Sequence, residues 1–209
     1  MLATMLKPHP KNFFTLLATL LLLACCDSTP KIRPLAPGAT VLAFGDSLTH
    51  GNGASESQSY PAVLEGLLGV EVVNAGVPGE VSAAGRKRLP GVVEQVQPQL
   101  VILIHGGNDF LRRLDSNQTR ENLRAMIETC RQQGTDVVLA GVPQFGLFLT
   151  PPTFYAKLAE EYRLPYLDDT LSDILKDNSL KSDPIHPNAV GYRQLAEALA
   201  ELIRAAERR

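Results

Sequence analysis

The sequence predicts a three-layer α/β/α domain built on a parallel β-sheet. Apolar, β-branched runs recur along the chain, and near-continuous apolar strands are typical of a sheet that is covered on both faces. Segments with apolar residues at helical spacing lie between these runs. Because strands and helices alternate, the strands are expected to be parallel. The sequence contains no internal repeat, which favours a single domain.

Each expected element is defined by its apolar pattern. The strands cover residues 41–44, 70–73, 100–104 and 137–140, with a shorter one at 165–167. The helices between them cover residues 60–68, 82–96, 119–133 and 153–162. Cys130 falls on the apolar stripe of the third helix and is expected to be a buried thiol. The last helix is the clearest, because Asn188 is placed to cap it and its expected buried stripe is Tyr192, Leu195, Leu199, Leu202 and Ile203.

The N-terminus has the pattern of an export signal. Two lysines precede an apolar run at residues 13–24 that stops at Cys25. These 12 residues are too few to span a bilayer as a helix, which favours a cleaved signal peptide over a membrane span. The end of the run, Leu22-Leu23-Ala24-Cys25, resembles a bacterial lipobox, in which the cysteine is acylated and becomes the new N-terminus. Cys26 offers a rival register, and ordinary secretion with cleavage near Ala24 is the other alternative.

These patterns divide the chain into three parts. We expect a signal peptide at residues 1–24, a lipidated Cys25 with a flexible tether at residues 25–39, and a folded domain at residues 40–209. The tether is inferred from a composition rich in Pro, Ser, Thr and Gly without apolar periodicity. The remaining stretch of about 170 residues is the size of one domain with a proper core.

Charge and cysteine spacing exclude several classes of partner. The formal net charge is −2, and the longest run of basic residues is Arg86-Lys87-Arg88. This triplet fits a solvated helix face, so nothing indicates a nucleic-acid partner. No Cys/His spacing of the zinc type occurs. We therefore expect a monomer without a metal or another cofactor.

Four short blocks carry the residue types of an acyl-transfer site. They are Gly45-Asp46-Ser47-Leu48, Asn74-Ala75-Gly76-Val77-Pro78-Gly79, Gly106-Gly107-Asn108-Asp109 and Asp183-Pro184-Ile185-His186-Pro187-Asn188. The first supplies a hydroxyl and the last a histidine with an aspartate three residues before it, whereas the middle two offer glycine amides and a carboxamide for an oxyanion. The first three blocks follow the first three strands, and the fourth leads into the last helix. All four are therefore expected at the edge of the sheet where the strands end.

In this order the blocks resemble the SGNH/GDSL hydrolase family, from about Thr40 to the C-terminus. The resemblance implies a five-stranded sheet in the order 2-1-3-4-5. It also implies the roles of the site residues: Ser47 as the nucleophile, His186 and Asp183 as the other triad members, and Ser47, Gly79 and Asn108 as oxyanion donors, with Gly76 as a rival for the glycine position. The second and third blocks look most like those of the bacterial multifunctional acyl-thioesterases, lysophospholipases and arylesterases.

Three residues within or beside the blocks are expected to support the site by packing and hydrogen bonding. His105 departs from the acidic or apolar residue expected before the Gly-Gly-Asn-Asp block. A histidine at the end of a strand is expected to be packed and hydrogen-bonded, and contact with substrate is the alternative. Asp46 and Asp109 are expected to brace their loops by accepting hydrogen bonds from backbone amides.

The expected activity is hydrolysis of acyl esters or thioesters through an acyl-enzyme on Ser47. A carbohydrate O-acetylesterase is the alternative, and a catalytically silent lipoprotein that binds lipid or sugar is a further one. A sugar site often has an aromatic platform, and the chain has no Trp. Two apolar loops favour an acyl pocket, with Phe110, Leu111, Phe145, Leu147 and Phe148 as its lining. The expected partners are the acyl ester and, through the lipid anchor on Cys25, a membrane of the bacterial cell envelope, with the enzyme facing the periplasm or the outer surface.

Overall fold

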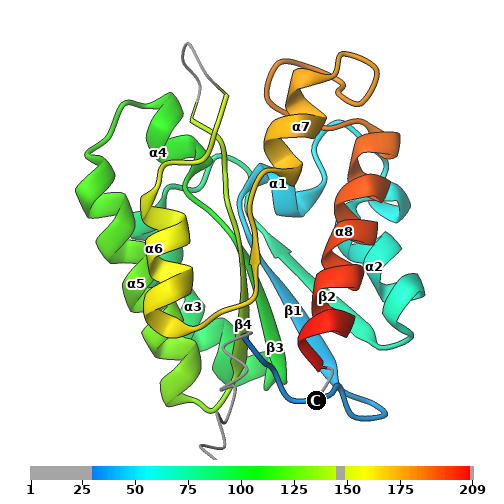
Figure 1. Cartoon of the computed structure of the whole chain (residues 1–209), viewed down its shortest axis with the longest axis vertical. Coiled ribbons are helices and arrows are strands. Elements are labelled where there is room, and N and C mark those ends of the chain that lie inside the picture. Colours follow the sequence, from blue (N-terminus) through cyan, green and yellow to red (C-terminus); the bar gives the residue numbers. More distant parts are fainter. Residues whose placement is uncertain (1–29, 145–148, 208–209) are drawn as a thin grey trace, which may run out of the picture.

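A five-stranded parallel sheet forms the centre of the computed structural model, which describes residues 30–144 and 149–207. The strands are β1 (Thr40–Gly45), β2 (Glu71–Gly76), β3 (Leu100–Ile104), β4 (Asp136–Ala140) and β5 (Tyr166–Leu167). Their order is β2-β1-β3-β4-β5, and every neighbouring pair is parallel. This order and the helices on both faces (Figure 1) confirm the predicted fold.

Helices cover both faces of this sheet. They are α1 (Ser47–His50), α2 (Tyr60–Leu68), α3 (Ser82–Val96), α4 (Gly107–Leu111), α5 (Ser116–Gln132), α6 (Phe154–Tyr162), α7 (Thr170–Lys176) and α8 (Ala189–Glu207), with a short 3-10 turn η1 (Glu56–Gln58). In Figure 1, α2 and α8 lie on one side of the sheet and α3, α5 and α6 on the other. The long helices lie where their periodicity predicts them. The sequence did not indicate α1, α4 and α7, which have seven residues or fewer, because so few residues show no helical period.

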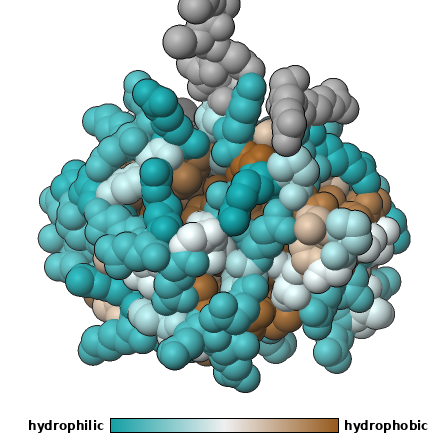
Figure 2. All heavy atoms as spheres, turned by 90° about the horizontal axis from the view of Figure 1, so that it is seen from below, coloured by the Kyte–Doolittle hydropathy of each residue, from teal (hydrophilic) through white to brown (hydrophobic). Residues whose placement is uncertain are grey.

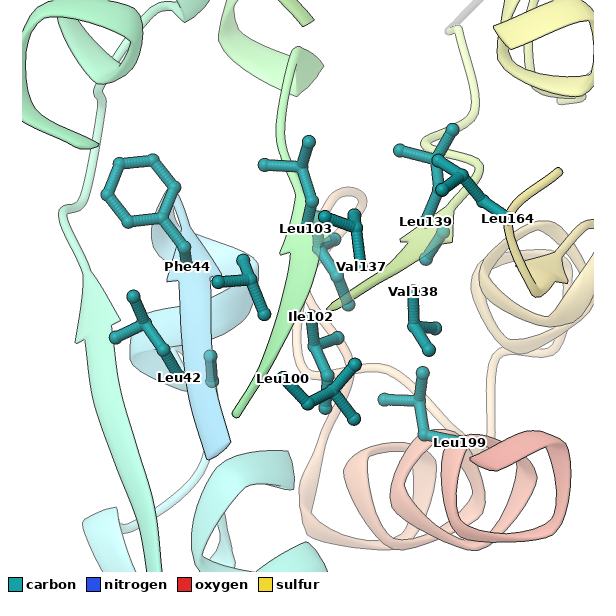
Figure 3. Packing of buried hydrophobic residues seen from close by; sticks show 14 of the residues in the cluster. Leu42, Phe44, Leu100, Ile102, Leu103, Val137, Val138, Leu139, Leu164 and Leu199 are labelled. Atoms are coloured by element: carbon teal, nitrogen blue, oxygen red, sulfur yellow. The ribbon is translucent and has the colours of Figure 1, made fainter. Parts of the chain in front are cut away.

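The hydrophobic core lies on both faces of the central strands. Successive side chains of a strand point to opposite faces, and all five residues of β3 are buried. Both faces of β3 must therefore be covered, as its continuous apolar sequence predicts. Figure 3 shows side chains of β1, β3 and β4 in this core together with Leu199 of α8.

Two further predictions are confirmed in the helices. The Asn188 side chain caps α8, because its Oδ1 accepts hydrogen bonds from the backbone N–H groups of Val190 and Gly191 at 3.0 and 3.1 Å. The expected stripe of α8 faces the core, with Leu202 partly buried and the other four residues fully buried. Cys130 of α5 is fully buried, and burial raises the pKa of its thiol to about 12.

The packed part of the chain begins before Thr40, inside the stretch expected to be a tether. Ile32 is buried, and both the backbone N–H and the Nε of Arg33 donate to the Asp136 carboxylate at 3.0 Å. The Leu35 N–H donates to Glu207 Oε1 at 2.7 Å. These contacts hold the segment against the edge of the sheet at which the strands begin. A single buried apolar residue in a proline-rich stretch produces no periodicity, so this packing could not be predicted from the sequence.

Cys25 and the expected signal peptide lie outside the described residues. Across residues 30–144 and 149–207, none of the helices combines the length and the apolar character needed to cross a bilayer.

Candidate active site

A chain of two hydrogen bonds joins Ser47, His186 and Asp183. Ser47 is the first residue of α1, directly after β1, and His186 lies in the loop that leads into α8. The Ser47 Oγ lies 2.9 Å from His186 Nε2, and His186 Nδ1 lies 2.7 Å from Asp183 Oδ2. The structure therefore brings together a hydroxyl, a base and a carboxylate that orients the base, as nucleophilic catalysis requires.

The loop before α8 fixes the tautomer of His186. Asp183 Oδ1 accepts hydrogen bonds from the backbone N–H groups of Ile185 and His186 at 2.8 and 2.9 Å. Partial burial raises the pKa of Asp183, but the hydrogen bonds from the imidazole and from these amides outweigh it and lower that pKa overall. The ionised carboxylate can only accept, so the proton of a neutral His186 ring is on Nδ1 and the Nε2 lone pair faces Ser47.

The turn that presents Ser47 is held by Asp46 and by close packing at Gly45. Asp46 is buried, and its Oδ1 accepts a hydrogen bond from the Leu48 N–H at 3.1 Å, which caps α1. A Cβ at Gly45 would collide with the Ile104 carbonyl oxygen and with Thr49. Only glycine, which has no Cβ, therefore fits between β1 and α1 while β1 remains paired with β3.

The resemblance implies three oxyanion donors, at Ser47, Gly79 and Asn108, and the structure shows which of these groups already have a hydrogen-bond partner. Within the described residues, no acceptor lies within hydrogen-bond distance of the backbone N–H of Ser47 or of Gly79. The Asn108 Nδ2 donates to Asp46 Oδ2 at 3.2 Å and to the Glu80 carbonyl oxygen at 3.1 Å. Both bonds are long, and an oxyanion is a stronger acceptor than a backbone carbonyl, so substrate can compete for this amide.

Gly79, rather than Gly76, has a free amide. The Gly76 N–H already donates to Asn74 Oδ1 at 3.0 Å. Gly79 adopts a φ of +76°, a left-handed conformation that residues with a side chain rarely adopt. Its carbonyl oxygen accepts a hydrogen bond from Arg112 Nη2 at 2.8 Å, which fixes the orientation of the turn.

A partly buried cluster of Glu80, Arg88 and His105 supports the Gly79 turn. The Glu80 carboxylate accepts two hydrogen bonds from Arg88, at 2.7 and 2.9 Å, and lies 3.2 Å from His105 Nε2. Arg88 Nη2 also donates to the Ala75 carbonyl oxygen at 3.0 Å, at the end of β2. The Glu80 side chain is only 7% exposed. Burial raises the pKa of Glu80, but the hydrogen bonds from His105 and Arg88 and the Arg88 charge lower it to about 2.

The structure tests the expectations for His105, for the basic triplet and for Asp109. His105 is fully buried and its Nδ1 accepts from the Gly106 N–H at 2.9 Å, which confirms that it is a packed, hydrogen-bonded residue. The expectation of a solvated triplet is wrong for Arg88, which turns inward to Glu80. Sequence reasoning missed Glu80 as well, although an acidic residue directly after the second block was a usable signal. Asp109 braces its loop as expected, by accepting from the Ser82 N–H at 2.8 Å.

A small apolar pocket of about 20 Å³ opens beside Ser47, Asn108 and His186. Its apolar lining consists of Leu48, Leu111, Val142, Pro143, Leu175 and Ile185. Leu111 was predicted, whereas the other five were not. They come from α1, α7 and the loops after β4 and before α8, so the pocket is assembled from the same edge of the sheet as the four blocks.

The expected acyl lining needs one correction. Phe110 is only 7% exposed and does not line the pocket, because its ring packs against Phe154 and Tyr155 in the core. Phe145, Leu147 and Phe148 lie outside the described residues. Among the described residues, no group of three or more His, Cys, Asp or Glu side chains is arranged to hold a metal ion.

Comparison with known proteins agrees with this geometry. Residues 43–194 match the model of the GDSL-like Lipase/Acylhydrolase family. The chain is 32% identical over 174 residues to thioesterase 1/protease 1/lysophospholipase L1 of Escherichia coli K12. The aligned region covers 79% of this chain and 84% of the relative. The chain is also 33% identical over 190 residues to esterase TesA of Pseudomonas aeruginosa, covering 85% and 94%.

A solved structure gives the same result. The crystal structure of TesA superimposes with a TM-score of 0.71 at 28% identity and covers 80% of this chain and 99% of that one. The chain therefore belongs to the GDSL-like lipase/acylhydrolase family, the SGNH hydrolases, and is an ester-hydrolysing enzyme.

Proposed function

We propose that hydrolysis proceeds through an acyl-enzyme on Ser47. The observation that carries this proposal is the hydrogen-bonded chain from Ser47 through His186 to Asp183, next to two backbone amides without acceptors in the described structure. A serine hydroxyl is a weak nucleophile at neutral pH, and the chain supplies the base that it lacks.

In the first half of the reaction, His186 Nε2 accepts the Ser47 proton as Oγ attacks the acyl carbonyl carbon. The ionised Asp183 stabilises the imidazolium that forms. Negative charge grows on the carbonyl oxygen, where the N–H groups of Ser47 and Gly79 and the Asn108 carboxamide act as donors. The tetrahedral species collapses when the imidazolium gives its proton to the leaving oxygen or sulfur, and the acyl group stays on Ser47.

Water completes the cycle. His186 takes a proton from a water molecule, which attacks the acyl-enzyme and passes through the same oxyanion site. Ser47 regains its proton as the carboxylic acid leaves. The same three residues therefore act in both halves of the reaction, and no other group needs to change its protonation state.

The acyl chain is the part of the substrate that fits the apolar pocket. Leu111, Val142 and Leu175 line it within reach of Ser47. The named relatives include a thioesterase and lysophospholipase, an esterase and an arylesterase. These names support acyl esters or thioesters as the substrate class, with specificity carried by the acyl group.

Covalent labelling tests the nucleophile. An organophosphonate ester should label the wild-type protein at Ser47 and inactivate it, and Ser47→Ala should be neither labelled nor active. In the described structure the Ser47 hydroxyl has no hydrogen-bond partner besides His186, so the circular dichroism spectrum of Ser47→Ala should match that of wild type. Labelling at a different serine would refute the assignment.

We further propose that the protein is anchored to a membrane of the cell envelope through acylated Cys25. The lipobox-like sequence supports this, and so does the position at which the packed chain begins. Six residues lie between Cys25 and Ile32, and the seven Cα–Cα steps give a reach of at most about 25 Å. The surface at this end of the sheet is mostly hydrophilic (Figure 2), which suits attachment by an anchor rather than by insertion of the domain.

This attachment point supports one orientation of the site relative to the bilayer. Ile32 bonds Ala206 at the C-terminal end of α8, whereas α1, which begins at Ser47, lies at the opposite end of the sheet (Figure 1). An anchored enzyme would face its site away from the bilayer that holds it. Mass spectrometry of the mature N-terminus tests the anchor: a diacylated Cys25 is expected, and an unmodified N-terminus beyond Cys25 would refute it.

A further inference from the structure

We propose that a second cavity beside His186 binds the leaving group, and that it selects a neutral alcohol with several hydroxyl groups. The proposal rests on the proposed role of Ser47. The polar cavity is lined by His50, Asn52, Glu56, Asn74, Asp183 and His186, together with backbone of the segment 51–54. Its volume is about 670 Å³.

The position of the cavity follows from the geometry of the attacked carbon. In the tetrahedral species, the attacked carbon carries four substituents. Two of them are Ser47 Oγ and the oxyanion, which points at its donors. The acyl chain and the leaving oxygen therefore extend in the two remaining directions. The apolar pocket lies on the Asn108 side, toward β3 and β4. The polar cavity lies on the Gly76 side, toward β2. His186 lines both, so a leaving group in the polar cavity remains beside the imidazole that must protonate it.

The hydrogen-bonding groups of the cavity that have no partner in the described structure can bind a hydroxyl group of a ligand. His50 Nδ1 bonds Asn52 Oδ1 at 2.9 Å, and because that oxygen only accepts, the remaining His50 nitrogen of a neutral ring is an acceptor. Within the described structure, the Asn52 Nδ2 and the Glu56 carboxylate have no hydrogen-bond partner. The cavity thus offers one donor and two acceptors, and a hydroxyl group can both donate and accept.

The charges of the lining exclude anions. Two carboxylates, Glu56 and Asp183, face the cavity, and its lining contains no lysine or arginine. A phosphate on the leaving group would be repelled by both carboxylates. A neutral polyol such as glycerol or a sugar meets only hydrogen-bonding partners there.

The cavity is preformed rather than assembled by the ligand. The Asn52 carbonyl oxygen accepts a hydrogen bond at 2.8 Å from the hydroxyl of Tyr192, a fully buried residue of α8. Gly53 has a φ of +98°, and a Cβ there would collide with the side chain of Ser182 and the Pro187 carbonyl oxygen. The segment 51–54 is therefore packed directly against the loop that carries Asp183 and His186.

Esters that share one acyl group and differ only in the alcohol test the subsite. The acyl group is the one that gives the fastest hydrolysis of its p-nitrophenyl ester, and the alcohols are p-nitrophenol, glycerol, glycerol 3-phosphate and methyl glucoside. Wild type should prefer the glycerol ester to the glycerol 3-phosphate ester about tenfold in kcat/KM. In Asn52→Ala, kcat/KM for the glycerol ester divided by kcat/KM for the p-nitrophenyl ester should fall about tenfold. Most of this change should lie in KM, because about one hydrogen bond is lost.

Two variants complete the test. Asn52→Asp keeps an oxygen that can bond His50, but it replaces the donor by an acceptor and adds a negative charge, so the ratio should again fall for these two uncharged esters. Asn178→Ala is the matched control, since Asn178 is exposed and outside the cavity, and its ratio should equal that of wild type. If the methyl glucoside ester is hydrolysed faster than the glycerol ester, the same subsite is supported with a carbohydrate as the leaving group.

The outcomes separate the two proposals. If no ester is hydrolysed, the proposed function fails and the subsite with it. If the p-nitrophenyl ester is hydrolysed but both Asn52 variants leave the ratio unchanged, or the phosphorylated ester is preferred, the subsite alone is refuted.

Discussion

Removing the charge of Glu80 should destabilise the protein and slow catalysis together. The pKa of Glu80 is lowered from 4.5 to about 2 in the folded state. At about 1.4 kcal/mol per pKa unit, this difference corresponds to about 3 kcal/mol of folding free energy at neutral pH. Glu80→Gln keeps the size of the side chain but leaves Arg88 facing an uncharged amide. We therefore expect this variant to lose about 3 kcal/mol of the free energy of unfolding at pH 7.

The sign of the pH dependence follows from the lowered pKa. A carboxylate whose folded-state pKa lies below its unfolded value stabilises the protein fully above about pH 4.5, and this contribution is lost as the pH falls toward 2. The difference in stability between wild type and Glu80→Gln should therefore be constant from pH 7 to pH 5. It should then shrink by about 1.4 kcal/mol per pH unit below 4.5.

Urea unfolding at pH 7, 5, 4 and 3 measures this difference. Glu121→Gln is the control, because Glu121 forms ion pairs with Arg120 and Arg124 on the surface, where water screens them. The kcat of Glu80→Gln should fall about 10- to 100-fold, since the Glu80 carbonyl oxygen holds Asn108 and the adjacent Gly79 carries a proposed oxyanion donor. A loss of less than about 1 kcal/mol at pH 7, or a loss that does not change between pH 7 and pH 3, would refute the reasoning.

Three further changes probe the site and its pocket. Asn108→Ala should lower kcat about 10²- to 10³-fold with little change in KM, as steady-state kinetics would show; an unchanged kcat would exclude its amide from the oxyanion site. Gly79→Ala places a side chain at a φ of +76° and should cost about 1–2 kcal/mol in thermal unfolding as well as lowering kcat, and a variant as stable as wild type would show that the turn relaxes. Replacing both Leu111 and Val142 by Ser should flatten the dependence of kcat/KM on acyl length, because each buried methylene is worth about 0.8 kcal/mol, or about fourfold. Activity that peaks at acetyl esters in wild type would instead favour an O-acetylesterase.

The reacting residues could be predicted because parallel strands bring their ends together. Ser47 and Asn108 each follow a buried apolar strand, and such strands are the most recognisable elements of this sequence. Once the strands are placed, their carboxyl ends lie at one edge whatever the loops do. The capped helix α8 fixes the position of the loop before it, and that loop carries His186 within 2.9 Å of Ser47.

The walls of the acyl pocket could not be predicted in the same way. Phe110 and Leu111 are neighbours in α4, yet Phe110 is 7% exposed and Leu111 is 44% exposed. Consecutive helical residues point about 100° apart, so one faces the core when the other faces the pocket. The sequence does not show this choice, because α4 has only five residues and too few apolar positions to reveal which face is buried. Leu175 belongs to α7, which is equally short, and its place in the pocket depends on how that helix packs.

Arg88 shows how a charged residue on a helix can be tied to the site. The three basic residues 86–88 are consecutive, so they point in three directions around α3 and cannot share one solvated face. Gly85 and Leu89 are buried, and Arg88 lies at the border of that buried face. A guanidinium in this position needs a partner, and the acidic residue that follows Gly79 provides it. The ion pair therefore satisfies a constraint of the helix and at the same time holds the turn that carries the proposed oxyanion donor Gly79.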